Sequence, residues 1–352
     1  MKLFIFGSTG DLVKRKIIPA FIELRPKDLE IVALGRKEFT DELYYKFICD
    51  DDCLKDFKTK PIYHKLDFEN DIICERCGDF LEKNEINFFY IALPPRALEP
   101  VLAYIGGVQE AGYQVRVLAE KPFGESKKHA QELREQLQQY HLIDVFYISD
   151  HYLFKEGVHK LPLDTYRNLK IVSLEMVGLE QRAAYYDGIG ALRDMVQSHF
   201  LNIIFRTLSN PQDEFENFSV KRYIPAQYGN GKDSGYVHEL GHPSATETFA
   251  QVTLITKTKT YECITGKRFD RKVSYMEIDT TRIDLENSAN AYVRLFDDFF
   301  KGNRESFVSI EHALLAWDIT ESIIKHADPL RYYPQGTSAL QAAEGNIELL
   351  SV

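Results

Sequence analysis

The sequence predicts an α/β protein of two domains, in which a doubly wound parallel sheet precedes an α+β domain with an antiparallel sheet. Short apolar runs alternate with helix-like segments through the first 150 residues, whereas strand-like and helix-like segments come in separate blocks afterwards. The length of 352 residues also suits two domains, at about 150 residues for each. We therefore expect one domain over residues 1–148 and a second over residues 149–352.

The first domain contains six apolar runs of strand length, at residues 2–6, 30–34, 61–66, 86–93, 115–119 and 143–148. The segments between them have helical apolar spacing, chiefly at residues 11–24, 41–49, 97–112 and 126–140. Strands that alternate with helices in this way form βαβ units, and βαβ units build parallel sheets.

The second domain begins with a turn-rich segment, residues 150–164, followed by a strand at 170–177 and a long helix at 189–208. Residues 209–244 are expected to be mainly loop. Three antiparallel strands are expected next, at 246–256, 258–264 and 273–280, and then two helices, at 289–300 and 310–325. This separation of strands from helices is typical of α+β domains.

The composition, 44% hydrophobic and 27% charged, is that of an ordinary globular protein. No apolar run approaches the roughly 20 residues that span a bilayer, and the apolar start at residues 3–6 is too short for a signal peptide. We therefore expect a cytoplasmic protein that does not bind membranes. The net charge of −10 argues against nucleic-acid binding. An anionic substrate would need a local cluster of cations.

Two patterns resemble zinc sites, and we expect no metal at either. Cys49 and Cys53, with Cys74 and Cys77, could supply four thiolates, but both pairs lie in segments typical of peripheral helices. The sequence HELGH at 238–242 fits the zinc-peptidase pattern, which functions on a helix. Its glycine-rich surroundings and the proline that follows predict a loop instead.

A nucleotide site is predicted where the first strand meets the first helix. Glycines in the turn GSTGDL (7–12) let the backbone approach a pyrophosphate, and the helix N-terminus supplies N–H donors. The expected cofactor-binding residues here are Gly7, Thr9, Gly10, Asp11 and Leu12. The first domain is thus expected to be a Rossmann-type dinucleotide-binding domain, although a plain tight turn is the alternative.

Arg36 follows the second strand, at the point where an NAD site usually has an acidic residue for the ribose 2′-hydroxyl. An arginine there suits the 2′-phosphate of NADP. We therefore expect NADP, with NAD as the alternative cofactor and a solvated surface arginine as the alternative role for Arg36.

Three further stretches carry a family resemblance: EKPFG (120–124), DHYLFKE (150–156) and the run from Glu180 to His199 that includes RDMVQSH. Together with GSTGDL they resemble the glucose-6-phosphate dehydrogenase family, in the same order and at similar spacing. Weaker similarities continue through QYG (227–229), TETF (246–249), TGK (265–267) and YPQG (333–336). The resemblance thus spans nearly the whole chain.

The resemblance implies an NADP-dependent dehydrogenase of carbohydrate metabolism, in the pentose phosphate pathway. It would oxidise C1 of a 6-phosphosugar, with D-glucose 6-phosphate to 6-phosphoglucono-1,5-lactone as the leading reaction. His199 matches the catalytic base, and Asp150 matches the carboxylate that pairs with it. A histidine suits removal of the C1 hydroxyl proton near neutral pH, and a carboxylate on its other nitrogen would stabilise the imidazolium.

Family positions also imply the binding residues. His151, Tyr152 and Lys155 match the phosphate grip, and a helical segment would place His151 and Lys155 on one face. Other matched positions face the sugar or the cofactor. Those facing the sugar are Glu175, Asp194, Lys121, Lys267 and Lys272; those lining the cofactor are Pro94, Pro95, Lys121 and Pro122.

The chain also departs from the family pattern. Two deletions are expected. One lies between residues 205 and 227, and the larger lies between residues 280 and 287, where the family carries further sheet strands. The second domain, which serves substrate binding and oligomerisation in the family, therefore has a reduced antiparallel sheet. The implied homodimer is left open. Ile148, Phe154 and Ser198 also replace usual family residues. Alternatives are therefore the same chemistry on a 2-amino or 2-acetamido 6-phosphosugar, a non-catalytic homologue that binds NADP or sugar phosphate, and a different Rossmann oxidoreductase.

Overall fold

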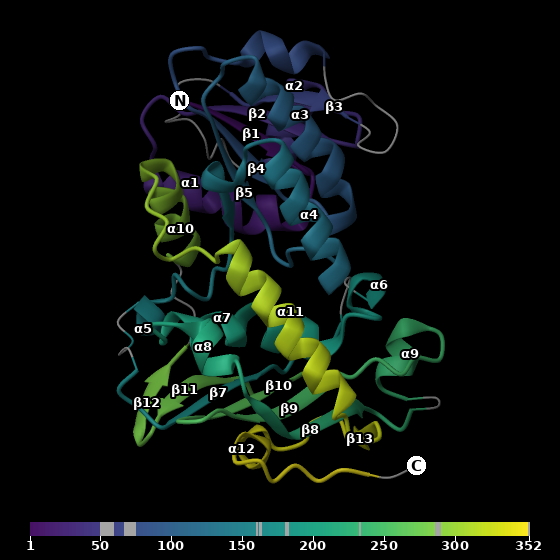
Figure 1. Ribbon diagram of the computed structural model, residues 1–352. Coiled ribbons are helices and arrows are strands. Elements are labelled where there is room, and N and C mark those ends of the chain that lie inside the picture. Colours follow the sequence, from purple (N-terminus) through teal and green to yellow (C-terminus); the bar gives the residue numbers. More distant parts are fainter. Residues whose placement is uncertain are drawn as a thin grey trace. The chain divides into compact units, whose positions relative to one another are not determined.

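A computed structural model describes residues 1–49, 60–66, 75–159, 161, 164–179, 183–231, 234–285 and 290–350 (Figure 1). The chain forms two compact units. Unit 1 comprises Met1–Phe154 and Ala289–Leu314, and unit 2 comprises Lys155–Ser288 and Leu315–Val352. Each unit has its own sheet. Among the described residues, none of the helices combines the length and the apolar character that crossing a bilayer requires.

Unit 1 contains a six-stranded, wholly parallel sheet in the order β3-β2-β1-β4-β5-β6. This order is that of the doubly wound dinucleotide-binding fold, so the fold predicted for the first half of the chain is confirmed. The strands are β1 (Lys2–Phe6), β2 (Glu30–Gly35), β3 (Ile62–Lys65), β4 (Asn87–Ile91), β5 (Val115–Ala119) and β6 (Phe146–Ile148).

Helical segments alternate with these strands. They are η1 (Val13–Ile17), α1 (Ile18–Leu24), α2 (Asp41–Ile48), η2 (Glu75–Phe80), η3 (Pro95–Ala97), α3 (Leu98–Glu110), α4 (Lys127–Gln139) and η4 (Ile143–Val145). Helices α2 and α4 are each preceded by a capping residue whose hydroxyl accepts a backbone N–H, Thr40 for α2 and Ser126 for α4. In Figure 1, α3 and α4 run side by side along the sheet, and the two helices are in contact.

Helix α10 (Ala291–Lys301), which comes late in the chain, packs in unit 1. Its Phe296 ring lies 4.6 Å from that of Phe21, and its Phe299 ring lies 5.5 Å from that of Phe88 on β4. Burial of these aromatic rings explains why α10 joins the first sheet. The domain boundary expected at residues 148 and 149 stays a proposal. The two units differ from it at residues 149–154 and in the segment that holds α10.

Unit 2 contains a seven-stranded mixed sheet in the order β12-β11-β7-β10-β9-β8-β13. β7 runs parallel to β10, and β13 runs parallel to β8. The α+β class expected for the second domain is confirmed, and its sheet is mixed because these two pairs are parallel while the other four are antiparallel. The strands are β7 (Asn168–Leu174), β8 (Ser219–Tyr228), β9 (Phe249–Ile255), β10 (Thr260–Gly266), β11 (Val273–Ile278), β12 (Thr281–Asp284) and β13 (Arg331–Tyr333).

The long strand β8 lies where residues 209–244 were expected to be mainly loop, so that prediction is wrong. Two features of the strand conceal it in the sequence. Its first half is exposed and polar, and Pro225, a residue that usually argues against a central strand, lies in its buried half. β8 nevertheless pairs with β9 on one side and β13 on the other.

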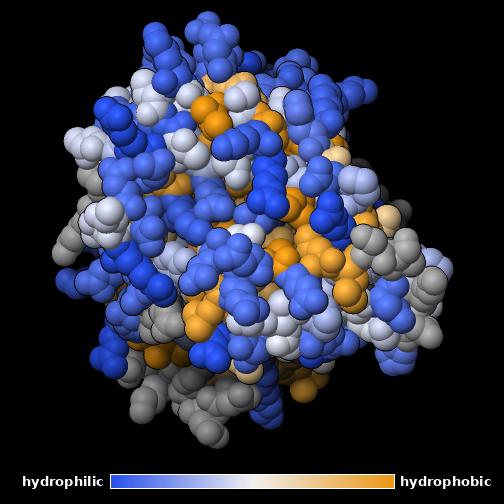
Figure 2. Space-filling model, turned by 90° about the horizontal axis from the view of Figure 1, so that it is seen from below, coloured by the Kyte–Doolittle hydropathy of each residue, from blue (hydrophilic) through white to orange (hydrophobic). Residues whose placement is uncertain are grey.

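The two faces of the unit 2 sheet are covered differently. Segment η6 (Leu192–Phe200) contacts β9 and β10 on one face and continues directly into α7 (Leu201–Arg206). The short helix α12 (Ala339–Ala343) joins a buried aromatic and aliphatic core on the other face. Figure 2, seen from below, shows a mainly hydrophilic surface with small apolar patches. The remaining helices are α5 (Glu156–His159), α6 (Ala183–Tyr186), α8 (Pro211–Phe215), α9 (Tyr236–Leu240) and α11 (Ile310–Lys325).

Candidate functional site

The glycine turn of unit 1 has a backbone that requires glycine at its first position. Gly7 follows β1 with a φ of +82°, and a Cβ there would lie 2.4 Å from the Ala92 carbonyl oxygen. The N–H groups of Gly7 and Ser8 donate to the Leu34 carbonyl at 3.0 and 2.9 Å. The turn therefore joins the carboxyl ends of β1, β2 and β4. This is the edge where parallel α/β sheets bind nucleotides.

Thr9 lies against the end of β2. A Cβ on Gly35 would come 2.8 Å from the Thr9 methyl carbon, so glycine at 35 allows this close approach. Gly10 is bonded to the turn through its N–H, which donates to the Gly7 carbonyl at 3.0 Å, and helix begins at Asp11 and Leu12. The five predicted turn residues thus form one continuous strand-to-helix turn.

Arg36 comes directly after β2 and is exposed. In the described part of the chain, no ion pair involves its guanidinium, so it is available to an anion. Two lysines that the sequence analysis did not select lie close by. The ammonium groups of Lys14 and Lys37 lie 5.6 and 5.1 Å from the centre of the Phe47 ring. The only sequence signal for them was the basic character of the segments 14–16 and 36–37.

The predicted cofactor-lining prolines follow β4 at the same sheet edge. Pro94 and Pro95 lead into η3, and the next residue, Arg96, forms an ion pair of 3.2 Å with Glu125. Glu125 belongs to the loop after β5 that also carries Lys121 and Pro122, and the Lys121–Pro122 peptide bond is cis. The loops after two neighbouring strands are therefore bonded to each other.

Glu120, which the sequence analysis did not select, joins this edge to the Asp150 motif. The Tyr90 hydroxyl donates to Glu120 Oε1 at 2.7 Å. Burial raises the pKa of Glu120, while the hydrogen bond from Tyr90, the nearby Ser149 hydroxyl and the charge of Lys121 oppose the shift. The charge of Asp150 adds to it. Lys121 and Asp150 are thus both close enough to Glu120 to affect its charge.

The Asp150 motif folds into turns rather than a helix. Asp150 Oδ1 accepts the N–H of Tyr152 at 3.0 Å, and the Asp150 carbonyl accepts the N–H of Leu153 at 3.0 Å. Bonds of this three-residue spacing continue to Phe154, so the helical condition proposed for residues 151–155 is not met. The His151 ring stacks on Tyr292 of α10, with centroids 5.4 Å apart and planes 13° apart.

In unit 2, Lys155 is buried, and its ammonium donates to the Leu285 carbonyl at 2.9 Å. Leu285 directly follows the edge strand β12. The phosphate-binding role of Lys155 stays a proposal.

Glu175 and Lys267 form an ion pair in unit 2, with Nζ 2.5 Å from Oε2. They follow the parallel neighbours β7 and β10, whose last residues are paired in register. The Lys267 ammonium also lies 5.3 Å from the centre of the Tyr186 ring. Burial raises the pKa of Tyr186 well above its usual range, and the charges of Asp194, Glu247 and Glu175 add to this. Tyr186 therefore joins the predicted residues Glu175, Lys267 and Asp194 into one group.

Two members of the predicted sugar-facing set are not in this group: Lys121, which belongs to unit 1, and Lys272. Lys272 is exposed in the loop before β11. Within the described ranges, no hydrogen bond or ion pair involves its ammonium.

Asp194 and His199 lie on η6, which is a π-helix over Leu192–Phe200, and both are buried. The N–H of Leu201 donates to the Val196 carbonyl, the five-residue spacing of this helix type. Two residues five apart are separated by about 1.4 turns in an α-helix, but by little more than one turn in a π-helix. The π geometry thus places Asp194 and His199 on the same side of the helix.

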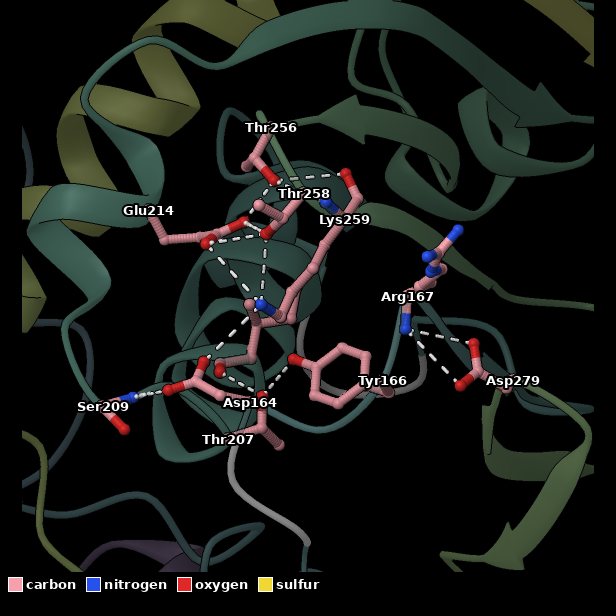
Figure 3. A network of polar contacts seen from close by, with 11 residues as sticks. Asp164, Tyr166, Arg167, Thr207, Ser209, Glu214, Thr256, Thr258, Lys259 and Asp279 are labelled. Carbon is pink, nitrogen blue, oxygen red and sulfur yellow. Dashed lines mark hydrogen bonds and ion pairs between the residues drawn. The ribbon is translucent and has the colours of Figure 1, made fainter.

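The C-terminal end of this helix is held by the polar network of Figure 3. Thr207 accepts the N–H of Asp164 at its carbonyl, at 2.9 Å, and its hydroxyl is bonded to the Tyr166 hydroxyl. The ammonium of Lys259 lies 3.6 Å from Asp164 and 3.7 Å from Glu214. The network therefore fixes the segment that follows His199.

The residues of the zinc-peptidase pattern, 238–242, make contacts within the fold. Residues Tyr236–Leu240 form the short helix α9, which corrects the expected loop, but Gly241 ends this helix before His242. Glu239 forms an ion pair with Arg268 at 2.5 Å and accepts the Tyr228 hydroxyl at 2.9 Å. The two histidines thus do not share a helical face. Of the cysteine pattern, Cys53 and Cys74 lie outside the described residues.

Two family models match the sequence. The model described as the NAD binding domain of glucose-6-phosphate dehydrogenase matches residues 4–160, and the model of the C-terminal domain matches residues 164–222. A glucose-6-phosphate 1-dehydrogenase of Bacillus subtilis (strain 168) is 30% identical over 337 residues, which cover 77% of this chain and 69% of the relative. One from Helicobacter pylori (strain J99) is 27% identical over 304 residues, covering 74% and 70%.

Solved structures share the fold. A glucose-6-phosphate dehydrogenase in complex with its substrate glucose-6-phosphate has a TM-score of 0.79 at 20% identity, covering 100% of this chain and 98% of that one. A glucose-6-phosphate 1-dehydrogenase from Mycobacterium avium has a TM-score of 0.81 at 18% identity, covering 99% and 98%. The likeness in fold therefore extends past residue 222, where the family-model match ends.

Proposed function

Because the chain belongs to the glucose-6-phosphate dehydrogenase family, we propose that it oxidises C1 of D-glucose 6-phosphate with NADP. The product is 6-phosphoglucono-1,5-lactone. The observation that carries the proposal is the π-helix η6, which presents Asp194 and His199 on one side in the unit that also holds the Glu175–Lys267 pair. A base and hydroxyl-binding groups are the side chains that oxidation of a sugar hemiacetal needs.

The residues of unit 1 fit a dinucleotide. The close approach of Gly7 to Ala92, together with the helix that begins after the turn, suits a pyrophosphate, and exposed Arg36 suits a 2′-phosphate. Lys14 and Lys37 add positive charge to this region, which supports NADP over NAD. When the cofactor is bound, its nicotinamide supplies the hydride acceptor.

The side chains of the chain then have separate tasks. His199 takes the proton of the C1 hydroxyl, and Asp150 stabilises the resulting imidazolium, as the family resemblance implies. Glu175 and Asp194 accept hydrogen bonds from sugar hydroxyls, and Lys267 and Lys272 face the sugar. The resemblance implies that Lys121 would lie between sugar and nicotinamide. His151, Tyr152 and Lys155 hold the 6-phosphate by charge-assisted bonds.

Enzyme assays with purified protein test this proposal. Formation of NADPH from NADP, or of NADH from NAD, is followed by near-ultraviolet absorbance. The substrates are glucose 6-phosphate, glucosamine 6-phosphate and N-acetylglucosamine 6-phosphate, each tested with both cofactors. A rate with glucose 6-phosphate and NADP is the expected result. A rate with only the amino or acetamido sugar phosphate would show that this sugar is the substrate instead. These sugars are tested because Phe154 and Ser198 replace family residues. If no combination of sugar phosphate and cofactor gives reduced cofactor, although binding is measurable, the chain is a non-catalytic homologue.

Location and assembly complete the proposal. We propose a cytoplasmic protein, and a homodimer is the assembly to test, by light scattering after gel filtration.

A further inference from the structure

Glu247 binds the start of the helix that carries Asp194 and His199. It lies in the loop before β9, and its Oε1 accepts the N–H of Leu192 at 2.9 Å. Its backbone carbonyl accepts the N–H of the preceding residue, Ala191, at 3.1 Å. A single residue therefore satisfies two consecutive amides at the helix N-terminus, where amides have no partner within the helix.

The chain leaves room for the Glu247 carboxylate by having glycine at position 190. Gly190 has a φ of +73°, and a Cβ there would lie 2.3 and 2.4 Å from the two carboxylate oxygens. Any side chain at this position would displace the carboxylate. The contact thus depends on two residues: Glu247, in the loop before β9, supplies the carboxylate, and Gly190 leaves the space that the carboxylate occupies.

The position of this contact along the helix gives it a functional consequence. Leu192 is the first residue of η6, and Asp194 follows it by two residues. Because a π-helix aligns residues five apart, the direction in which its first turn starts decides where both Asp194 and His199 point. A small rotation at the start would misplace both side chains, and small misplacements in an active site lower rates strongly.

We propose that Glu247 is a positioning residue, which fixes the start of η6 and thereby aims Asp194 and His199 at the substrate. The inference rests on the proposed function for the roles of those two residues. The anchoring of the helix by Glu247 is a separate claim that can be tested without activity.

A cavity of about 280 Å³ adjoins the contact. Its lining includes Glu247, Arg193 from η6, Tyr223 from β8 and Asp328 from the segment after α11. The cavity gives the carboxyl access to solvent protons. Of the titratable groups around Glu247, Arg193 is cationic, Asp328 is anionic, and Tyr223 and Tyr186 are tyrosines whose pKa values are raised.

Glu247 therefore titrates near neutral pH. Burial raises its pKa to about 7, against the lowering effects of the Leu192 N–H, the charge of Arg193 and the Tyr223 hydroxyl. The ionised carboxylate is the stronger acceptor for the Leu192 N–H. Burial outweighs this effect, so the folded state favours the protonated carboxyl, whose carbonyl oxygen can still accept the Leu192 N–H.

Hydrogen–deuterium exchange of the full chain tests the anchor directly. Glu247→Ala should speed exchange about tenfold in peptides covering residues 189–199, the effect of losing one bond to a charged group. Glu247→Gln, whose amide oxygen can accept the same N–H, should restore most of the protection. Asp279→Asn is the matched control, because Asp279 accepts the N–H of Asn168 at 2.9 Å, away from η6. Exchange in 189–199 that matches the control would overturn the inference.

Kinetics test the consequence. Glu247→Ala should lower kcat by about 10- to 100-fold and raise the KM for glucose 6-phosphate, with the KM for NADP unchanged. Glu247→Gln should recover kcat to within about threefold of the wild type, because the neutral amide oxygen can accept the Leu192 N–H in place of the carboxylate. A kcat for Glu247→Ala equal to that of Asp279→Asn would contradict the positioning role. A wild type without activity would refute the proposed function and leave the exchange result intact.

If Glu247→Ala does not fold, the Gln variant tests through pH whether Glu247 is the titrating group in this contact. A carboxyl with a raised pKa stabilises the fold fully below about pH 4.5, and this stability is lost as the pH rises through about 7. The free energy of unfolding of the wild type should therefore fall relative to Glu247→Gln between these values. A difference that stays constant with pH would show that Glu247 does not titrate in this contact.

Discussion

Glu175 and Lys267 form an ion pair at the ends of two parallel strands, with 2.5 Å between Oε2 and Nζ. The pairing of Gly266 with Leu174 in the last register of β10 and β7 sets the two residues side by side. The ring of Tyr186 lies beneath the same ammonium. The pairing of the two strands therefore holds a carboxylate and an ammonium together, and both are expected to face the sugar.

Glu175→Gln and Lys267→Met should each raise the KM for glucose 6-phosphate by about tenfold or more, because each removes a charged hydrogen-bonding group. In the double variant the two effects should not add, because the pair acts as a unit. Steady-state kinetics with varied sugar phosphate measure both. Lys170 and Glu262 are the control pair, on the same two strands at 2.9 Å. Additive effects at Glu175 and Lys267 would contradict a shared role.

His199→Asn should lower kcat by about 10²–10⁴-fold, the usual contribution of a general base, with little change in substrate binding. His238→Asn is the control, since His238 is exposed and lies in the zinc-peptidase pattern. It should keep wild-type turnover. Near-normal turnover in His199→Asn would exclude His199 as the base.

Arg36→Ala should raise the KM for NADP by about 10- to 100-fold, the value of a hydrogen bond between charged groups. The KM for NAD should change little, because NAD has no 2′-phosphate. Lys37→Ala should have a smaller effect in the same direction, and Lys27→Ala, at the opposite end of β2, none. Equal losses for both cofactors would show that Arg36 does not read the 2′-phosphate.

Lys259→Met should destabilise the fold by about 1–3 kcal/mol, because it removes the ammonium that pairs with Asp164 and Glu214 (Figure 3). Exposed Lys257→Met is the control, and urea unfolding measures both. The pKa of Asp164 is lowered, chiefly by a hydrogen bond from Ser209 and also by Lys259. The difference should therefore be full above about pH 4 and shrink as the pH falls further. A Lys259→Met variant as stable as the control would contradict a structural role for the network.

The sequence predicted unit 1 well because a buried parallel strand is a nearly continuous apolar run. β1 and β5 have the predicted bounds, and the other four strands lie within the predicted runs or extend them by one residue. It could not assign α10, since an amphipathic pattern predicts burial of one face without naming the sheet that covers it. β8 was missed because polar residues and Pro225 interrupt its pattern.

The site was predicted less completely, for a related reason. The motifs identified Asp194 and His199, but the π geometry that aligns them leaves no distinct apolar period. The Glu175–Lys267 pair depends on the parallel pairing of β7 and β10, which are far apart in sequence. Glu247 was visible only as part of the weak TETF similarity, and its role emerges from a contact with a glycine 57 residues earlier.

Transfer of deuterium tests the central claim most directly. Glucose 6-phosphate that carries deuterium at C1 is incubated with the protein and NADP, and the mass of the reduced cofactor is measured. The proposed reaction predicts NADPH heavier by one deuterium, with the lactone or its hydrolysis product free of the label. Reduced cofactor without deuterium would contradict oxidation at C1, and no reduced cofactor at all would contradict the proposed dehydrogenase activity on this sugar.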